Sequence, residues 1–264
     1  MALRASIGQY YSVDSPIHRV DPRVKLVVAI CYMASCLFVS SAPSLALAGA
    51  AVATAVAFSR VPVGRLLAQI KPIALFLVVT SLINLFFVRT GVVVASLGPV
   101  AVHADGVEAA VLYTTRFFLL LLAGSLLMLT TTPTSLTDAF ARVFAPLERI
   151  GVPVSQAAVV LAIALRFVPT LAREADNVIA ASAARGADLE GKSALAYARA
   201  CVPLVVPLFA SAIRHADNLG RAMDARCYTG ERRSRMHELE FDARRDAPFA
   251  LGALAYLLAL AAIL

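Results

Sequence analysis

One stretch decides the fold class: LVVAICYMASCLFVSSAPSLALAGAAVATAVAFS, residues 26–59, contains no Asp, Glu, Lys, Arg or His. Its 34 residues exceed what one helix needs to cross a bilayer core about 30 Å thick, since a helix rises about 1.5 Å per residue. A Ser-Ser-Ala-Pro sequence at residues 40–43 interrupts the stretch and favours a turn. The stretch therefore predicts two short membrane-spanning helices.

Three further uncharged runs continue this pattern, at residues 72–88, 117–137 and 247–264. The chain of 264 residues is 60% hydrophobic and 16% charged, with a mean hydropathy of +0.78. Soluble domains are about 45–50% apolar and about 25% charged. We therefore expect an all-α polytopic membrane protein with about five transmembrane helices, the fourth beginning near Gly106.

Basic residues predict the orientation of these spans. They precede the first span and lie between the second and third, at Arg4, Arg19, Arg23, Lys25, Arg60, Arg65 and Lys71. The opposite side has little beyond Arg89, so the positive-inside rule places the N-terminus and residues 131–246 in the cytoplasm. The net charge of +7 then reflects topology, and no nucleic acid is expected as a partner, because residues 131–246 mix 15 basic with 13 acidic residues.

A cleaved signal peptide, ending at Ala46-Leu47-Ala48, is the alternative for the N-terminus. Asp14, Asp21 and two prolines argue against it, because a signal peptide begins with a short basic region. The four cysteines form no C-x-x-C pair and predict small core residues in a reducing compartment, with no metal site: Cys31, Cys36, Cys201 and Cys227.

Two further positions carry local predictions. Asp21-Pro22 predicts the start of the first helix, with a capping carboxylate followed by proline at the first helical position. Arg116 lies among apolar residues of the fourth span. It either faces the bundle interior or a partner, or it extends toward the interface from a shifted span.

The character of the chain changes after residue 132. Residues 135–149 predict a short amphipathic helix closed by Gly151-Val152-Pro153, and longer helices follow around residues 154–186 and 194–227. Each longer segment begins like a membrane helix and ends like a soluble one.

The two longer segments also resemble each other at an offset of 41 residues. Ala175-Asp176-Asn177 recurs as Ala216-Asp217-Asn218, and Ala184-Arg185 recurs as Ala225-Arg226. Six of the twelve positions match between residues 175–186 and 216–227. A duplicated helix with an arginine at its C-terminal end predicts two equivalent binding sites on partners, because a guanidinium group pairs well with carboxylates or carbonyls.

Residues 186–193 match the phosphate-binding pattern G-x-x-x-x-G-K-[ST], and nucleotide binding there is an alternative function. A phosphate loop follows a buried strand, whereas residues 180–184 favour helix, and Asp188 and Glu190 would face the phosphates. We therefore interpret Gly186 as the end of a helix, in the left-handed conformation that glycine adopts easily.

Four sequences together resemble the transmembrane T component of energy-coupling factor transporters, bacterial uptake systems for vitamins and transition metals. They are SPIHRVDPRVKL (15–26), TTPTSLTDAFARVFAPLERIGVP (131–153), LRFVPTLAREADNVIAASAARGAD (165–188) and VPLFASAIRHADNLGRAMDARCYTG (206–230). The resemblance implies that two arginine motifs dock on two ABC ATPase subunits, and that the chain holds a small substrate-binding membrane (S) subunit. The docking residues would be Ala184, Arg185 and Gly186, and Ala225, Arg226 and Cys227. The family usually has glycine at the position of Cys227.

The segments expected are 1–130 with four transmembrane helices, 131–246 with cytoplasmic coupling helices, and 247–264 as the C-terminal transmembrane helix. We expect a membrane-embedded coupling subunit in the bacterial inner membrane, with no catalytic residue, cofactor or metal of its own. An intramembrane enzyme is the alternative, although no His or acidic pair lies within a predicted span.

Overall fold

In the computed structural model, residues 10–88, 90–97, 100–186, 194–229 and 242–263 are described. The chain forms two compact units. One comprises residues 8–143 and 239–264, here called the bundle unit, and the other comprises residues 1–7 and 144–238, here called the arm unit. Each unit is described by itself.

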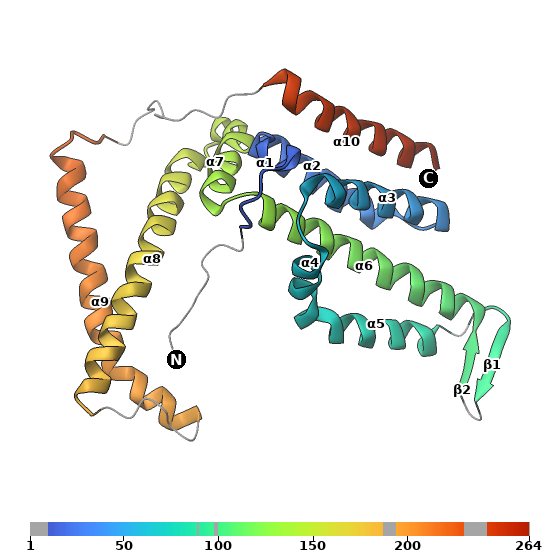
Figure 1. Ribbon diagram of the computed structural model, residues 1–264, viewed down its shortest axis with the longest axis horizontal. Coiled ribbons are helices and arrows are strands. Elements are labelled where there is room, and N and C mark those ends of the chain that lie inside the picture. Colours follow the sequence, from blue (N-terminus) through green and yellow to red (C-terminus); the bar gives the residue numbers. More distant parts are fainter. Residues whose placement is uncertain (1–9, 89, 98–99, 187–193, 230–241, 264) are drawn as a thin grey trace. The chain divides into compact units, whose positions relative to one another are not determined.

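The bundle unit is mostly helical (Figure 1). Its elements are α1 (Pro16–Arg19), α2 (Pro22–Phe38), α3 (Ala42–Ser59), α4 (Val63–Ile70), the 3-10 helix η1 (Lys71–Ile73), α5 (Ala74–Phe87), β1 (Val93–Leu97), β2 (Val100–His103), α6 (Ala104–Thr130), α7 (Pro133–Val143) and α10 (Ala243–Ile263). The arm unit contains η2 (Ala145–Ile150), α8 (Val154–Ala184) and α9 (Ala194–Asp224). The predicted all-α class is confirmed.

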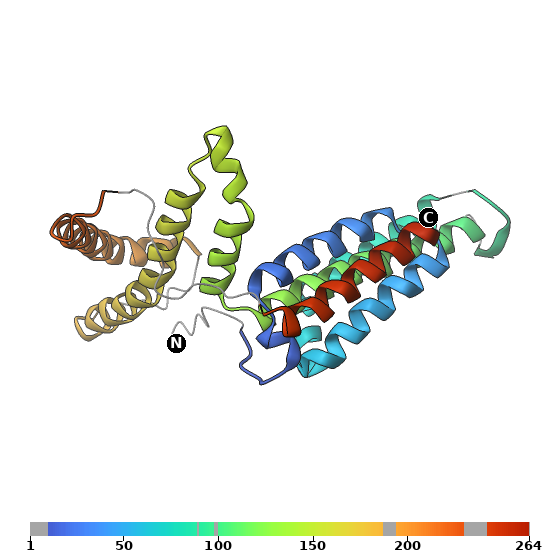
Figure 2. The ribbon, with the colours of Figure 1, turned by 90° about the horizontal axis from the view of Figure 1, so that it is seen from above.

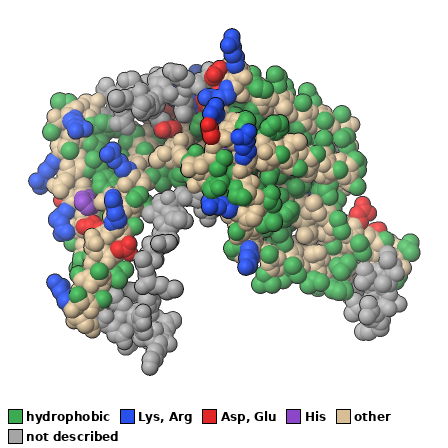
Figure 3. Space-filling model, viewed as in Figure 1, with side chains coloured by type: hydrophobic (Ala, Val, Ile, Leu, Met, Phe, Trp, Pro, Cys, Tyr) green, Lys and Arg blue, Asp and Glu red, His purple; other side chains and the backbone are tan. Residues whose placement is uncertain are grey.

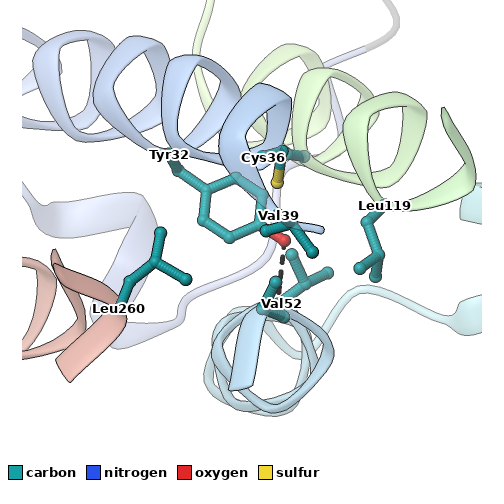
Figure 4. Close-up of a cluster of buried hydrophobic side chains, with 8 residues drawn as sticks. Tyr32, Cys36, Val39, Val52, Leu119 and Leu260 are labelled. Atoms are coloured by element: carbon teal, nitrogen blue, oxygen red, sulfur yellow. Dashed lines mark hydrogen bonds between the residues drawn. The ribbon is translucent and has the colours of Figure 1, made fainter. Parts of the chain in front are cut away.

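The core of the bundle unit lies where α2, α3, α6 and α10 pack side by side (Figures 1 and 2). Tyr32 projects from α2 toward α3, and its hydroxyl donates a hydrogen bond to the carbonyl oxygen of Ala48 over 3.0 Å (Figure 4). Ala48 is fully buried, and such a small side chain allows two helices to approach closely. Cys36 is buried in this core as predicted, whereas Cys31 is exposed.

The predicted breaks between the first helices are confirmed. The Asp21 side chain accepts a hydrogen bond from the N–H of Arg23, and Pro22 opens α2. The helix ends at Phe38, and Ser41 caps α3, in which Pro43 occupies the first turn. These ends follow from local capping, which the sequence makes visible.

Among the described residues, five helical segments are long and apolar enough to cross a membrane: Ala42–Ser59, Val63–Phe87, Ala104–Thr130, Val154–Ala184 and Ala243–Ile263. The number of these segments agrees with the expected five, but they are not the same five helices. The 17-residue α2 is not among them, and α8, which the sequence placed among the cytoplasmic helices, is. The Asp21 cap and the break at residues 40–43 limit α2 to 17 residues, whereas the first half of α8 is nearly uncharged.

The surface of the bundle unit is apolar where a bilayer would surround it. Leu75 and Phe87 on α5 are 74% and 81% exposed, and hydrophobic side chains cover the flank of the bundle in Figure 3. Soluble proteins rarely expose such continuous apolar area. The unit therefore has the surface of a membrane-embedded bundle.

A two-stranded antiparallel hairpin between α5 and α6 was not predicted. Strands β1 and β2 pair from Val93 opposite His103 to Leu97 opposite Val100. The β-branched valines at residues 92–94 favour extended backbone, and the Gly98-Pro99 dipeptide is a turn signal.

Arg116 faces the interior of the bundle, which agrees with the first of its two interpretations. Its guanidinium group donates to the carbonyl oxygen of Val39 at the end of α2 and lies 5.1 Å from the ring centre of Tyr113. The last carbonyl groups of a helix lack partners within the helix, and a cation is favourable there. Arg116 therefore caps α2 from a neighbouring helix.

A buried lysine joins the start of α2 to the end of α6. The Nζ of Lys25 donates to the carbonyl oxygens of Thr130 at 3.0 Å and of His18 at 3.3 Å. Thr130 is the last residue of α6, so its carbonyl has no donor within the helix. This contact fixes the point from which the chain continues toward α7.

The segment after α6 differs in detail from its prediction. α7 ends at Val143 rather than near residue 149, and a 3-10 helix continues to Ile150. Gly151 has the left-handed φ of 89° that ends this segment, as its sequence suggested.

Candidate functional site

The first arginine motif ends α8 in the way that the sequence predicts. The helix closes at Ala184, Arg185 is the C-cap residue, and Gly186 has a φ of 85°. The N–H of Gly186 donates to the carbonyl oxygen of Ala183 over 2.9 Å. Nothing lies within 4 Å of where a Cβ of Gly186 would be. The left-handed backbone conformation, and not close packing, therefore explains the glycine at this position.

The second motif has the same geometry without the glycine. Asp224 is the last residue of α9, and Cys227 has a φ of 54°. The N–H of Cys227 donates to Asp224 over 2.9 Å, and that of Tyr228 donates to Met223 over 3.0 Å. This pair of bonds is the Schellman arrangement of a helix end. Replacing the usual glycine by cysteine therefore leaves the left-handed turn in place.

The two arginines occupy equivalent positions at two equivalent helix ends. Both Arg185 and Arg226 directly precede the left-handed residue, and both are exposed, as are Ala184 and Ala225. Within the described residues, neither guanidinium group makes a hydrogen bond or an ion pair. Each motif thus presents an exposed cation at the tip of a long helix, without a partner in the described part of the chain.

The structure separates the two tips rather than bringing them together. In Figure 1, α8 and α9 run in opposite directions and cross, and the two helices contact each other within the arm unit. Arg185 and Arg226 therefore lie on opposite sides of the crossing. An arrangement of this kind suits two separate binding events.

The crossing itself is polar, and the sequence interpretation did not single it out. Glu174 on α8 meets Ser211 and His215 on α9, with 3.4 Å between Glu174 Oε2 and His215 Nε2. One signal was available, because Glu174 and His215 are 41 residues apart, the same offset as the arginine motifs.

One face of α9 is apolar and exposed. Its members recur at helical spacing: Val202, Val205, Val206, Phe209 and Ile213. Leu204 and Ser211, on the opposite face, are buried. An uncovered apolar stripe of this size marks a surface for a partner or for the lipid interface.

Gly186 does not begin a phosphate loop in the manner of a nucleotide-binding fold. The residues before it, 180–184, belong to α8, whereas the phosphate loop follows a strand. Residues 187–193, including Lys192, lie outside the described residues.

Known proteins match the chain through both motifs. Residues 14–238 match the family described as cobalt transport protein. The energy-coupling factor transporter transmembrane proteins of Heliobacterium modesticaldum and Ruminiclostridium cellulolyticum are each 40% identical to it, over 89% of this chain and 88% of theirs.

A third relative is longer. A Bifidobacterium longum protein named as an ABC transporter ATP-binding protein is 42% identical over 98% of this chain, which spans 33% of that protein. The family match, the two similar transmembrane proteins and the apolar bundle agree. The chain is a multi-pass membrane protein and belongs to the family of energy-coupling factor transporter transmembrane proteins.

Proposed function

We propose that this chain is the coupling subunit of a bacterial uptake transporter, and that Arg185 and Arg226 each dock one of two ABC ATPase subunits. The observation that carries the proposal is the pair of matching helix ends, each with an exposed arginine before a left-handed residue, on opposite sides of one crossing. Two equivalent tips suit two equivalent ATPases. The chain would transmit their movement without catalysing a reaction itself.

The relative from Bifidobacterium longum supports an ATPase as partner. A segment similar to nearly all of this chain makes up a third of a protein named for ATP binding. A membrane segment of this kind and an ATP-binding function therefore belong to one polypeptide in that organism. We infer that an ATP-binding function acts together with the membrane segment here as well.

The charge distribution of the bundle unit supports a cytoplasmic position for the arginine motifs. Lys and Arg gather at the end where α1, α2 and α10 begin, and acidic side chains lie at the opposite end of the bundle (Figure 3). The start of α6 carries Asp105 and Glu108. Thr130 ends α6 at the basic end, next to Lys25. By the positive-inside rule this end faces the cytoplasm of the inner membrane, and the chain continues from there to α8 and α9.

The apolar stripe of α9 is our candidate contact for the small substrate-binding membrane (S) subunit. A membrane-embedded partner would cover Val205 and Phe209, which are 58% and 67% exposed. The substrate would be a vitamin or a transition-metal ion, bound by that partner.

Co-purification of the ATPase subunits and ATP-driven uptake in vesicles test the docking proposal. Truncating a central interface arginine often costs about 2 kcal/mol, so Arg185→Ala or Arg226→Ala should weaken ATPase binding roughly thirtyfold. Arg185→Glu should weaken it further, and the double Arg185→Glu and Arg226→Glu variant should retain no ATPase.

Two controls make this experiment decisive. Arg221→Ala removes an exposed arginine five residues before Arg226 and should keep normal docking. Lys192→Ala, outside the described residues, should keep normal uptake unless residues 186–193 bind phosphate. Normal uptake in the double arginine variant, together with its loss in Lys192→Ala, would reverse the proposal.

A further inference from the structure

The contact between α8 and α9 is small and polar. The hydroxyl of Ser211 donates to Glu174 Oε1, and Glu174 Oε2 lies 3.4 Å from His215 Nε2. The ring of Phe167 lies 5.8 Å from that of His215. In the described part of the arm unit, the buried residues are Ala158, Leu204 and Ser211. Ser211 is therefore one of the few buried residues in the described part of the arm unit.

The contact joins equivalent positions of the internal repeat. The offset of 41 residues that relates Arg185 to Arg226 also relates Glu174 to His215, and it relates Thr170 to Ser211. In an isologous interface between two oppositely directed helices, equivalent residues meet where the two-fold axis passes. The contact between Glu174 and His215 has this character, because the two residues hold equivalent positions on oppositely directed helices.

The repeat gives equal length to the two helix segments that lead from the crossing to the arginines, here called the arms. Arg185 follows Glu174 by eleven residues, and Arg226 follows His215 by eleven. At about 1.5 Å per residue, each arginine is about 16 Å from the crossing, in opposite directions. A change in the angle at the crossing would therefore change the separation of the two tips.

Each helix is also weakened close to the crossing. Pro169 precedes Glu174 by five residues, and Pro207 precedes Ser211 by four. A proline inside a helix removes one backbone hydrogen bond and favours a bend at that point. Each helix can therefore bend at its proline, close to the polar contact, while the helical segment that leads from the contact to the arginine remains continuous.

We propose that Glu174, Ser211 and His215 form the pivot of the coupling helices, a set of positioning residues that fixes the separation of Arg185 and Arg226. This inference rests on the proposed function for its effect on transport, but the geometry of the pivot does not depend on it. The pivot residues touch neither ATPase nor substrate. They act through the arms by holding both tips at the spacing that two ATPase subunits require.

The separation of the arms is measured with spin labels at Ala181 and Ala222, which are exposed and equivalent in the repeat. The labels are attached to cysteines in a chain whose four native cysteines are replaced by alanine and which retains uptake. The chain is measured in lipid nanodiscs, both alone and in complex with its ATPases. Glu174→Ala and His215→Ala should each broaden the distribution of distances and lower uptake per assembled complex roughly threefold or more, with ATPases still bound.

Exchange of the pair provides the sharpest test. The double variant Glu174→His with His215→Glu keeps both partners and exchanges their helices, and Thr170, the equivalent of Ser211 in the repeat, is the expected donor to the exchanged carboxylate. This variant should restore the narrow distribution and most of the uptake. The matched control is Asp217→Asn, which removes an exposed carboxylate two residues from His215 and should change neither measurement.

The outcomes separate the pivot from the docking proposal. A native distribution in Glu174→Ala, or a broad one in the exchanged variant, would overturn the pivot. If the native chain binds no ATPase, the docking proposal fails, while the distances in the chain alone still decide whether the pivot exists. Loss of ATPase binding in Glu174→Ala with an unchanged distribution would also overturn the pivot, because it would make Glu174 a docking residue.

Discussion

The side chain of Asp246 accepts a hydrogen bond from the backbone N–H of Asp21, 225 positions earlier in the chain, over 2.9 Å. Its second oxygen accepts from the N–H of Asp242 over 3.0 Å, and the residue is fully buried. One carboxylate thus lies at the N-terminal ends of both α2 and α10, where the helix dipoles favour negative charge. It attaches the C-terminal helix to the first helices of the bundle.

Asp246→Ala should lower the stability of the bundle by about 2–4 kcal/mol, because it leaves the buried N–H of Asp21 and the partly buried N–H of Asp242 without an acceptor. Asp246→Asn keeps one side-chain oxygen as acceptor and should cost less. The measurement is thermal unfolding of the purified protein in detergent. Arg244→Ala, an exposed change two residues away, serves as control and should stay within about 0.5 kcal/mol. Equal losses in Asp246→Ala and Arg244→Ala would contradict this role of the carboxylate.

The left-handed residue at the end of α9 makes Cys227 a site for stabilisation. A side chain at a φ of 54° is disfavoured by up to about 1 kcal/mol, so Cys227→Gly should raise the unfolding temperature slightly and keep uptake. Cys227→Val should lower it, because a β-branched side chain tolerates positive φ poorly. Gly186→Ala, at a φ of 85°, should lower it as well. A protein that prefers valine at position 227 would not end α9 with a left-handed turn.

The pH dependence of stability should include a contribution from His18. Burial lowers the pKa of His18 below the usual value of 6.5, with the nearby Lys25 charge acting in the same direction. The unfolded chain therefore binds a proton at higher pH than the folded chain. The stability that this group contributes is fully present above pH 6.5. It is lost as the pH falls through 6.5 toward the lower pKa of His18 in the folded state.

His18→Gln should remove that contribution. Unfolding temperatures between about pH 7.5 and about pH 5.5 should fall less steeply in this variant than in the native protein. Gln keeps a donor for the carbonyl oxygen of Tyr11, which His18 Nε2 contacts at 2.9 Å. Identical pH profiles would show that His18 does not titrate differently on folding.

The orientation of the chain is tested by labelling single cysteines in a cysteine-free background. A cysteine at Ser234, which lies outside the described residues, should react with membrane-impermeant reagents in inside-out vesicles and remain unlabelled in intact cells. Val92→Cys, at an exposed position before β1, should show the opposite pattern. Labelling of Ser234→Cys in intact cells would invert the proposed topology.

Much of the helical pattern follows from the sequence, because helix starts and ends depend on neighbouring residues. Asp21-Pro22 caps α2, Ser41 caps α3, and Gly186 ends α8, each through contacts within a few positions. The repeat at an offset of 41 residues likewise identified both arginine motifs. Their docking role remains a prediction.

Other features depend on contacts between distant segments, and no local pattern specifies them. The side of the helix that Arg116 presents to α2, and the burial of Asp246 against Asp21, result from packing across 77 and 225 positions. The meeting of Glu174 with His215 is of the same kind. Their equivalent positions in the repeat can be seen in the sequence, but only the crossing of two oppositely directed helices brings them into contact, because a sequence repeat does not by itself determine how two helices pack.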